Sequence, residues 1–140
     1  MKTKIAILLF LGFALAGWCA DVKVVVNAAN PITSIDKADL QKIFLGKKNT
    51  WDDGKKIASM YVKADKPEGA AFFDKVLGIG FSAFNAQWMK MLYSGNATPP
   101  QARGNSDEVV NVVSLLENSI GFVAADYNVT NPKVKVITLK

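Results

Sequence analysis

The stretch VKADKPEGAA, residues 62–71, has the residue types that could hold a small anion. Pro67 favours the first turn of a helix, and two lysines precede it. The first N–H groups of a helix have no partner inside the helix, so that end attracts anions. The candidate anion-binding residues lie at two expected helix starts: Lys63, Lys66, Gly69 and Ala70 at one, and Thr33 and Ser34 at the other.

The same stretch also fits a second interpretation, a well-capped helix start without a ligand. Pro67 has no N–H to donate, and no hydroxyl follows it in this turn. Glu68 places a negative charge where an anion would bind, although a carboxylate there stabilises the helix itself. The loss of donors favours the capped helix start over the anion cradle.

Catalytic and metal-binding side chains are scarce in this chain. It has no histidine and one cysteine, Cys19, which excludes the usual nucleophile dyads and most transition-metal sites. The adjacent acids Asp52 and Asp53 sit in a turn-like WDDG segment, and no GxxxxGK[ST] or GxGxxG motif occurs. We therefore expect no enzyme activity, no metal and no cofactor.

Residues 1–20 have the layout of a secretory signal peptide, with Lys2 and Lys4 followed by an apolar run and small residues. Cleavage after residue 16, 19 or 20 is compatible with the sequence, and a single N-terminal anchor helix is the alternative. Lipidation of Cys19 is disfavoured because Trp18 is bulky. We expect an exported protein whose one domain spans residues 21–140, without a membrane span after cleavage.

The charge of the chain limits its partners. There are 17 basic and 12 acidic residues; without Lys2 and Lys4, 15 bases face 12 acids, for a net charge of +3. Arg103 is the only arginine, and no dense basic run occurs. Nucleic acid is therefore not an expected partner, whereas a weak attraction for small anions fits the charge.

The elements between residues 21 and 140 alternate in type. β-branched runs predict strands, and apolar residues at helical spacing predict helices. Strands are expected at 21–27, 57–62, 120–126 and 134–140, and helices within 34–46, 67–78, 81–93 and 106–118, with a loop at 94–104. Asn105 and Glu108 form a capping box, and Ser34 or Asp36 could cap the first helix. This order predicts an α/β fold with a partly parallel sheet whose terminal strands lie together.

Several of these segments together resemble the phosphate-binding-protein-like substrate-binding family of ABC transporters. The matching features are Asn30-Pro31 after a strand, Leu40, Ile43-Phe44 and Gly46 in the following helix, Trp51 in a turn, and SIGFVAADY at 119–127. They extend over nearly all of residues 22–140. The resemblance implies a single domain of periplasmic-binding-protein type 2, a mixed sheet flanked by helices.

The resemblance further implies a periplasmic solute-binding protein or subunit for phosphate or a similar oxyanion, working with an ABC transporter. Two departures bear on that function. The family has two domains that close on the ligand, and this chain is long enough for one. Where the family has an arginine and then Ser-Gly-Thr at a helix start, this chain has Lys63 and then Glu68-Gly69-Ala70. The alternative is a periplasmic module that binds another protein or an envelope component and has kept only the fold.

Overall fold

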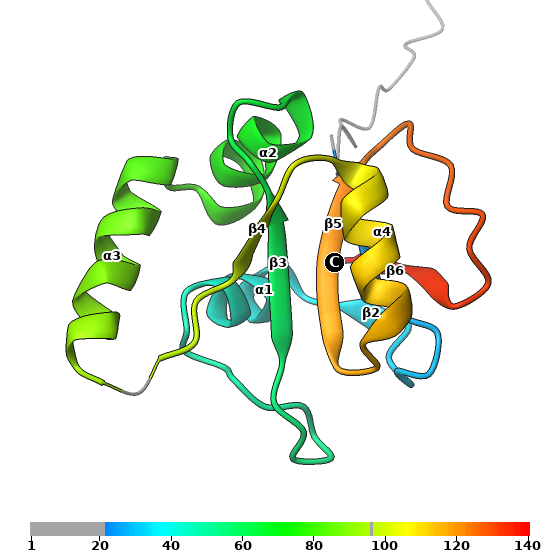
Figure 1. The fold of residues 1–140 in the computed structure, drawn as a ribbon, viewed down its shortest axis with the longest axis horizontal. Coiled ribbons are helices and arrows are strands. Elements are labelled where there is room, and N and C mark those ends of the chain that lie inside the picture. Colours follow the sequence, from blue (N-terminus) through cyan, green and yellow to red (C-terminus); the bar gives the residue numbers. More distant parts are fainter. Residues whose placement is uncertain (1–21, 96) are drawn as a thin grey trace, which may run out of the picture.

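The computed structural model describes residues 22–95 and 97–140, which form one sheet with helices on both faces (Figure 1). The strands are β1 (Val22–Asn27), β2 (Ser34–Ile35), β3 (Ala58–Val62), β4 (Gln101–Arg103), β5 (Ser119–Ala124) and β6 (Val134–Leu139). The helices are α1 (Lys37–Phe44), α2 (Pro67–Ala71), η1 (Phe72–Leu77), α3 (Phe81–Tyr93) and α4 (Ser106–Leu115). The expected α/β fold is confirmed.

The sheet is mixed, with its six strands in the order β2-β6-β1-β5-β3-β4. β3 runs parallel to both of its neighbours, β4 and β5, while β1 runs antiparallel to β5 and β6. β1 and β6 pair along their length, so the two ends of the described chain lie in one sheet, as expected. Because β3, β4 and β5 are parallel, their carboxyl ends lie on the same side of the sheet, along the edge that the strand ends form.

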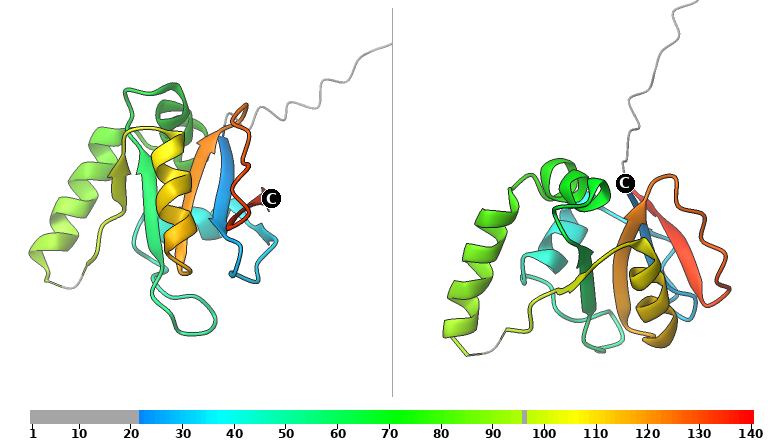
Figure 2. Two further views of the ribbon diagram at one scale, coloured as in Figure 1. Left: turned by 45° about the vertical axis from the view of Figure 1, so that its right-hand side comes forward. Right: turned by 45° about the horizontal axis from the view of Figure 1, so that its top comes forward.

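The two faces of the sheet are covered by different helices, as the turned views show (Figure 2). On one face, Gly121 of β5 lets α4 approach so closely that an added Cβ would lie 2.8 Å from Cγ1 of Val109. On the other face, Phe122 stacks on Phe72 of η1 at 4.0 Å, and Phe44 of α1 meets Phe72 edge to face at 4.7 Å. These aromatic rings are fully buried and anchor η1 and α1 to the sheet.

Two short strands were not expected from the sequence. β4 lies in the segment that was interpreted as a loop. β2 begins at Ser34, so Ser34 does not cap α1, and Asp36 is the N-cap residue of that helix. Both strands are at the edges of the sheet. The single helix expected at 67–78 is an α-helical turn followed by a π-helix, and Gly78 ends it in the left-handed conformation (φ 69°), as expected.

No helix in residues 22–95 and 97–140 combines the length and the apolar character needed to cross a bilayer. The signal peptide expected at residues 1–20 lies outside the described residues.

We predict that Phe72→Ala lowers the free energy of unfolding by about 3–5 kcal/mol, because it removes the ring that joins Phe44 and Phe122. Phe81→Ala is the control: Phe81 is 39% exposed and should cost less than about 1.5 kcal/mol. Urea unfolding of both variants measures the difference. Equal losses would show that the stacked rings do not anchor η1.

Candidate anion site at the start of helix α2

The β3–α2 junction places both candidate lysines at the edge where the parallel strands end. Lys63 follows β3 and donates its N–H to the carbonyl of Arg103 at 3.0 Å, and Lys66 closes the turn by donating to the Lys63 carbonyl at 3.0 Å. Lys66 is the N-cap residue of α2, and Pro67 is the first residue of the helix. Both lysine side chains are exposed, and neither ammonium has an ion pair or hydrogen bond among the described residues.

Gly69 is buried where α2 meets the end of β3. A Cβ on Gly69 would lie 2.0 Å from the Lys63 carbonyl oxygen and 2.5 Å from that of Val62, which only glycine avoids. Gly69 is therefore required for packing, whether or not its N–H contacts a ligand. Ala70 donates its N–H to the Lys66 carbonyl at 2.9 Å, so that donor is used inside the turn.

The carboxylate of Glu68 lies at this helix start and is tied to neighbouring elements. The Ser106 hydroxyl donates to Glu68 Oε1 at 3.3 Å and accepts the N–H of Ala124 at 3.0 Å. This chain of bonds links α2, the start of α4 and the end of β5. A protein carboxylate therefore lies at this helix start, where its charge would repel an oxyanion.

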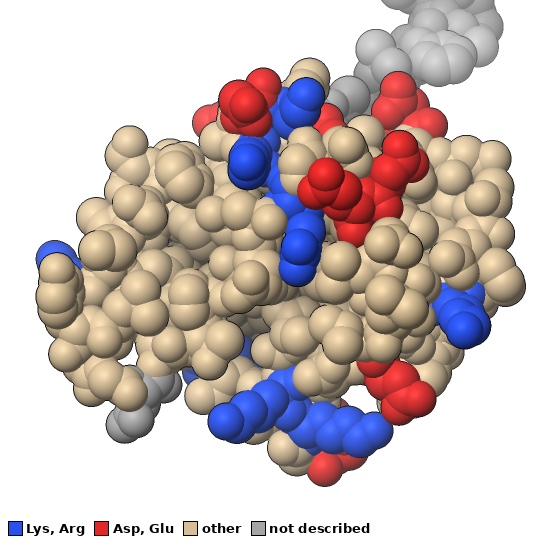
Figure 3. All heavy atoms as spheres, in the orientation of Figure 1, with Lys and Arg blue, Asp and Glu red and all other residues tan. Residues whose placement is uncertain are grey.

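The start of α4 lies at the same edge and is filled by the capping box expected from the sequence. Asn105 Oδ1 accepts the N–H of Glu108 at 3.0 Å, and Glu108 Oε2 accepts the N–H of Gly104 at 2.7 Å. Basic side chains gather over β3 and β4, with acidic ones over the start of α4 (Figure 3). The two kinds of charge therefore meet side by side at this edge.

Arg103 is a candidate that sequence reasoning missed. It pairs with Val62 in the parallel β3–β4 register, which places it beside Lys63. Its Nε is buried, with no hydrogen-bond partner among the described residues. A guanidinium can grip an oxyanion with two parallel hydrogen bonds, which a lysine cannot. The sequence did single out Arg103 as its only arginine. Because β4 was not predicted, however, nothing in the sequence indicated that this residue lies beside Lys63.

The structure does not bring Thr33 and Ser34 to the lysines. Ser34 lies in β2, which is separated from β3 by three intervening strands, and four strand steps of about 4.8 Å put the two places roughly 19 Å apart. Thr33 uses its carbonyl to accept the N–H of Thr138. The six candidates therefore form two separate groups, and only Lys63, Lys66, Gly69 and Ala70 lie together.

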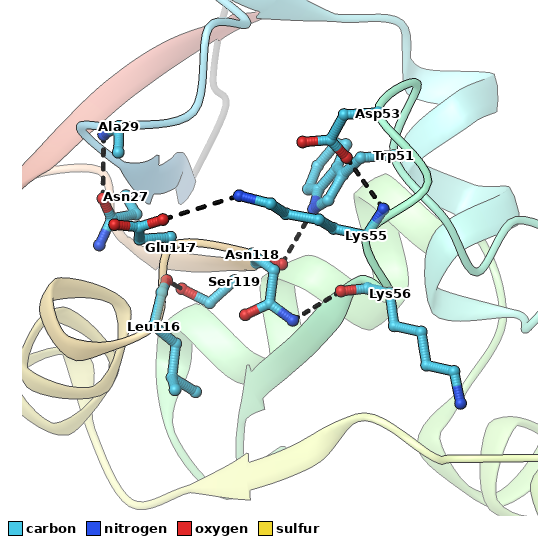
Figure 4. A network of polar contacts seen from close by, with 10 residues as sticks. All are labelled: Asn27, Ala29, Trp51, Asp53, Lys55, Lys56, Leu116, Glu117, Asn118 and Ser119. Carbon is cyan, nitrogen blue, oxygen red and sulfur yellow. Dashed lines mark hydrogen bonds and ion pairs between the residues drawn. The ribbon is translucent and has the colours of Figure 1, made fainter.

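A cavity of about 640 Å³ lies elsewhere, beside Ser34 and the amino ends of β3 and β5. Five acids face three lysines in its lining: Asp36, Asp39, Asp52, Asp53 and Glu117 against Lys48, Lys55 and Lys140. Trp51 donates its indole N–H to the Asn118 carbonyl at 2.9 Å, and Lys55 pairs with Glu117 at 3.7 Å (Figure 4). Because Lys55 is already paired with Glu117 here, whereas Arg103 Nε at the β3–α2 junction has no hydrogen-bond partner among the described residues, we do not place the anion site in this cavity.

Comparison with known proteins supports the expected fold. No family profile matches the chain, and no curated protein matches it. A PstS from Borrelia burgdorferi superposes with a TM-score of 0.68 at 19% identity, over 86% of this chain and 47% of that one. An ABC-type phosphate transport receptor from Vibrio cholerae gives 0.63 at 19% identity, over 85% and 46%.

These comparisons confirm the resemblance as a likeness of fold: the chain has the fold of a periplasmic-binding-protein type 2 domain. At this identity the likeness concerns the fold alone. The chain spans less than half the length of the proteins that it matches.

We predict that Gly69→Ala lowers the free energy of unfolding by about 3 kcal/mol or more, since the backbone at the β3–α2 junction must move apart. Gly80→Ala is the matched control. Gly80 is the N-cap residue of α3 with φ −69°, and an added Cβ meets nothing within 4 Å, so the change should cost less than about 1 kcal/mol. A stable Gly69→Ala variant would contradict the close backbone contact.

The start of α4 also carries a hydrogen bond that predicts a titration. Tyr127 donates its hydroxyl to Asp107 Oδ1 at 2.6 Å, and this bond, with smaller effects of burial and of the Asp107 charge, raises the pKa of Tyr127 above 10.0. The stabilisation is complete below pH 10 and is lost as the pH rises through the folded pKa. Asp107→Asn should lower the Tyr127 pKa toward 10.0, measured by NMR titration; an unchanged pKa would contradict the assignment.

Proposed function

We propose that this protein is an exported single-domain solute-binding protein that binds a small oxyanion, phosphate first. The binding place is where the carboxyl ends of β3, β4 and β5 meet the start of α2. We call this place, with Lys63, Lys66 and Arg103, the oxyanion edge. One observation carries the proposal: Lys63, Lys66 and Arg103 lie near one another where β3 and β4 end, and their side chains have no hydrogen bond or ion pair among the described residues. In open α/β sheets, ligands bind beyond the carboxyl ends of the strands.

The chemistry at this edge favours oxyanions over neutral solutes. Lys63 and Lys66 supply charge from the β3–α2 turn, and Arg103 supplies a forked donor from β4. The N–H groups of Glu68 and Gly69 have no hydrogen bond to the described residues and lie in the first turn of α2. The proteins of like fold are a phosphate receptor and a PstS, which makes phosphate the first anion to test.

Binding at this edge should be weak. The described residues offer an open face rather than an enclosed cleft here, so they bury only part of an anion. The Glu68 carboxylate repels an anion at the same place. We infer a link to an ABC transporter from the proteins of similar fold. This domain would act as a subunit that presents the anion to the transporter.

We predict that Lys63→Ala/Lys66→Ala weakens phosphate binding about tenfold, measured by calorimetry at low salt with sulfate as a second anion. The control Lys47→Ala/Lys133→Ala removes two exposed lysines away from this edge, with the same change in net charge. It should change affinity less than twofold. Unchanged affinity in the first variant, or equal loss in both, would remove the assignment to α2.

We predict that Glu68→Gln raises phosphate affinity about fivefold, because the amide keeps the size of the side chain and removes its charge. The hydrogen bond from Ser106 can still reach the amide oxygen, so the junction stays folded. The same calorimetric titration measures it. Weaker binding in this variant would mean that the carboxylate does not lie next to the anion.

A second candidate function is favoured by the exposed side of α3. This helix stands at the edge of the molecule beyond β4 (Figure 2), and Lys90 is its only charged residue. Phe81, Met89, Leu92 and Tyr93 are exposed on it, Tyr93 by 86%. Such a surface fits a periplasmic protein-interaction module. A specific partner recovered from a periplasmic extract supports this function, whereas a monomer that binds phosphate and recovers no partner counts against it.

A further inference from the structure

A second cavity, of about 300 Å³, lies between the end of α1, the start of β3 and the carboxyl half of α3. The surface is hollowed between α3 and the 48–57 loop (Figure 3). The apolar part of the lining consists of Ile43, Gly46, Ile57, Ala58, Trp88, Met91 and Ala97. The polar part consists of Lys48, Asn49, Thr50, Lys56, Ser59, Thr98 and Asn118. None of these residues belongs to the oxyanion edge.

The apolar wall is built by a close contact between Gly46 and α3. Gly46 has φ 76°, and an added Cβ would lie 2.5 Å from Met91 Cε and 2.8 Å from the Trp88 ring. Trp88 donates its indole N–H to the Phe44 carbonyl at 2.9 Å, so its polar atom is satisfied inside the core. The ring therefore offers only hydrocarbon to its surroundings.

The polar wall is cationic. Lys48 and Lys56 line the cavity and no acid does, whereas five acids line the larger cavity. Lys48 is half-buried, and neither ammonium has an ion pair or hydrogen bond among the described residues. Lys56 points away from Lys55, which reaches toward Glu117 on the other side (Figure 4). The adjacent lysines thus serve different cavities.

The backbone around the polar wall is fixed by hydrogen bonds. Asn118 Nδ2 donates to the Lys56 carbonyl at 2.6 Å, and Ile57 donates its N–H to the Asn49 carbonyl at 2.9 Å. The segments that carry the two lysines are therefore held against each other. A cavity with an apolar floor and a few placed polar groups has the general form of a small-molecule site.

We propose that this cavity binds a small amphiphilic carboxylate, with its apolar tail against Trp88 and Met91 and its carboxylate at Lys48 and Lys56. Lys56 and Lys48, which also borders the larger cavity, supply the positive charge that selects an anion, and the apolar floor selects a hydrocarbon tail. At about 30 Å³ per water-sized group, the volume fits a ligand of about ten heavy atoms, the size of octanoate. The site is separate from the oxyanion edge.

The test is titration of the purified protein with octanoate, followed by calorimetry and by backbone amide NMR. We expect saturable one-to-one binding, with amide shifts that include Gly46, Asn49 and Thr98. Lys48→Ala/Lys56→Ala should weaken binding about tenfold, and Lys55→Ala, which alters the neighbouring lysine, less than twofold. Ala97→Leu narrows the cavity and should also weaken octanoate binding.

Three outcomes would overturn the proposal: no saturable octanoate binding, unchanged affinity in Lys48→Ala/Lys56→Ala, or octyltrimethylammonium binding as tightly as octanoate. Octanol should bind at least tenfold more weakly than octanoate. Saturating phosphate should leave octanoate affinity unchanged, and displacement of octanoate by phosphate would refute a separate site. Failure of phosphate binding in the same protein would concern only the oxyanion edge, so the two proposals are tested independently.

Discussion

The contact between Gly69 and the backbone at the end of β3 is the constraint on which the rest of this edge depends. An added Cβ would be 2.0 Å from the Lys63 carbonyl oxygen, so the first turn of α2 lies directly on the strand. That position fixes Lys63 and Lys66 on one side of the turn and directs η1 across the sheet toward Phe122. The glycine at the place where the resemblance implies Ser-Gly-Thr is thus explained by packing alone, and its presence is weak support for ligand binding.

The hydroxyls that the resemblance led us to expect at this helix start are absent, and bonds within the chain join the elements there. Glu68, Ser106 and the N–H of Ala124 form a connected series across α2, α4 and β5. This arrangement keeps the three elements joined when no anion is present. The same bonds place a carboxylate beside the cations, which lowers the attraction for an anion.

The sequence predicted the features that local rules determine. The four long strands β1, β3, β5 and β6 were predicted from their strand-like residue runs. Gly78 and the Asn105–Glu108 capping box followed from helix-end chemistry, and the aromatic core from helical spacing. It did not predict β4, whose three residues have no pattern of their own and are a strand only because β3 lies beside them. Arg103 was missed for that reason, and Ser34 was misplaced because β2 exists only through β6.

Distribution of charge, more than net charge, decides where an anion can bind in this domain. The oxyanion edge sets Lys63, Lys66 and Arg103 against four nearby acids in sequence and space: Asp65, Glu68, Asp107 and Glu108. The long-range field there does not concentrate anions, so binding must come from short, directed bonds made by the unpartnered Arg103 and the first N–H groups of α2. The smaller cavity has the opposite character: no acid lines it, and its cations act on an apolar floor. One domain of modest positive charge therefore holds two chemically different anion environments, and an anion with a hydrocarbon tail is the kind that distinguishes them.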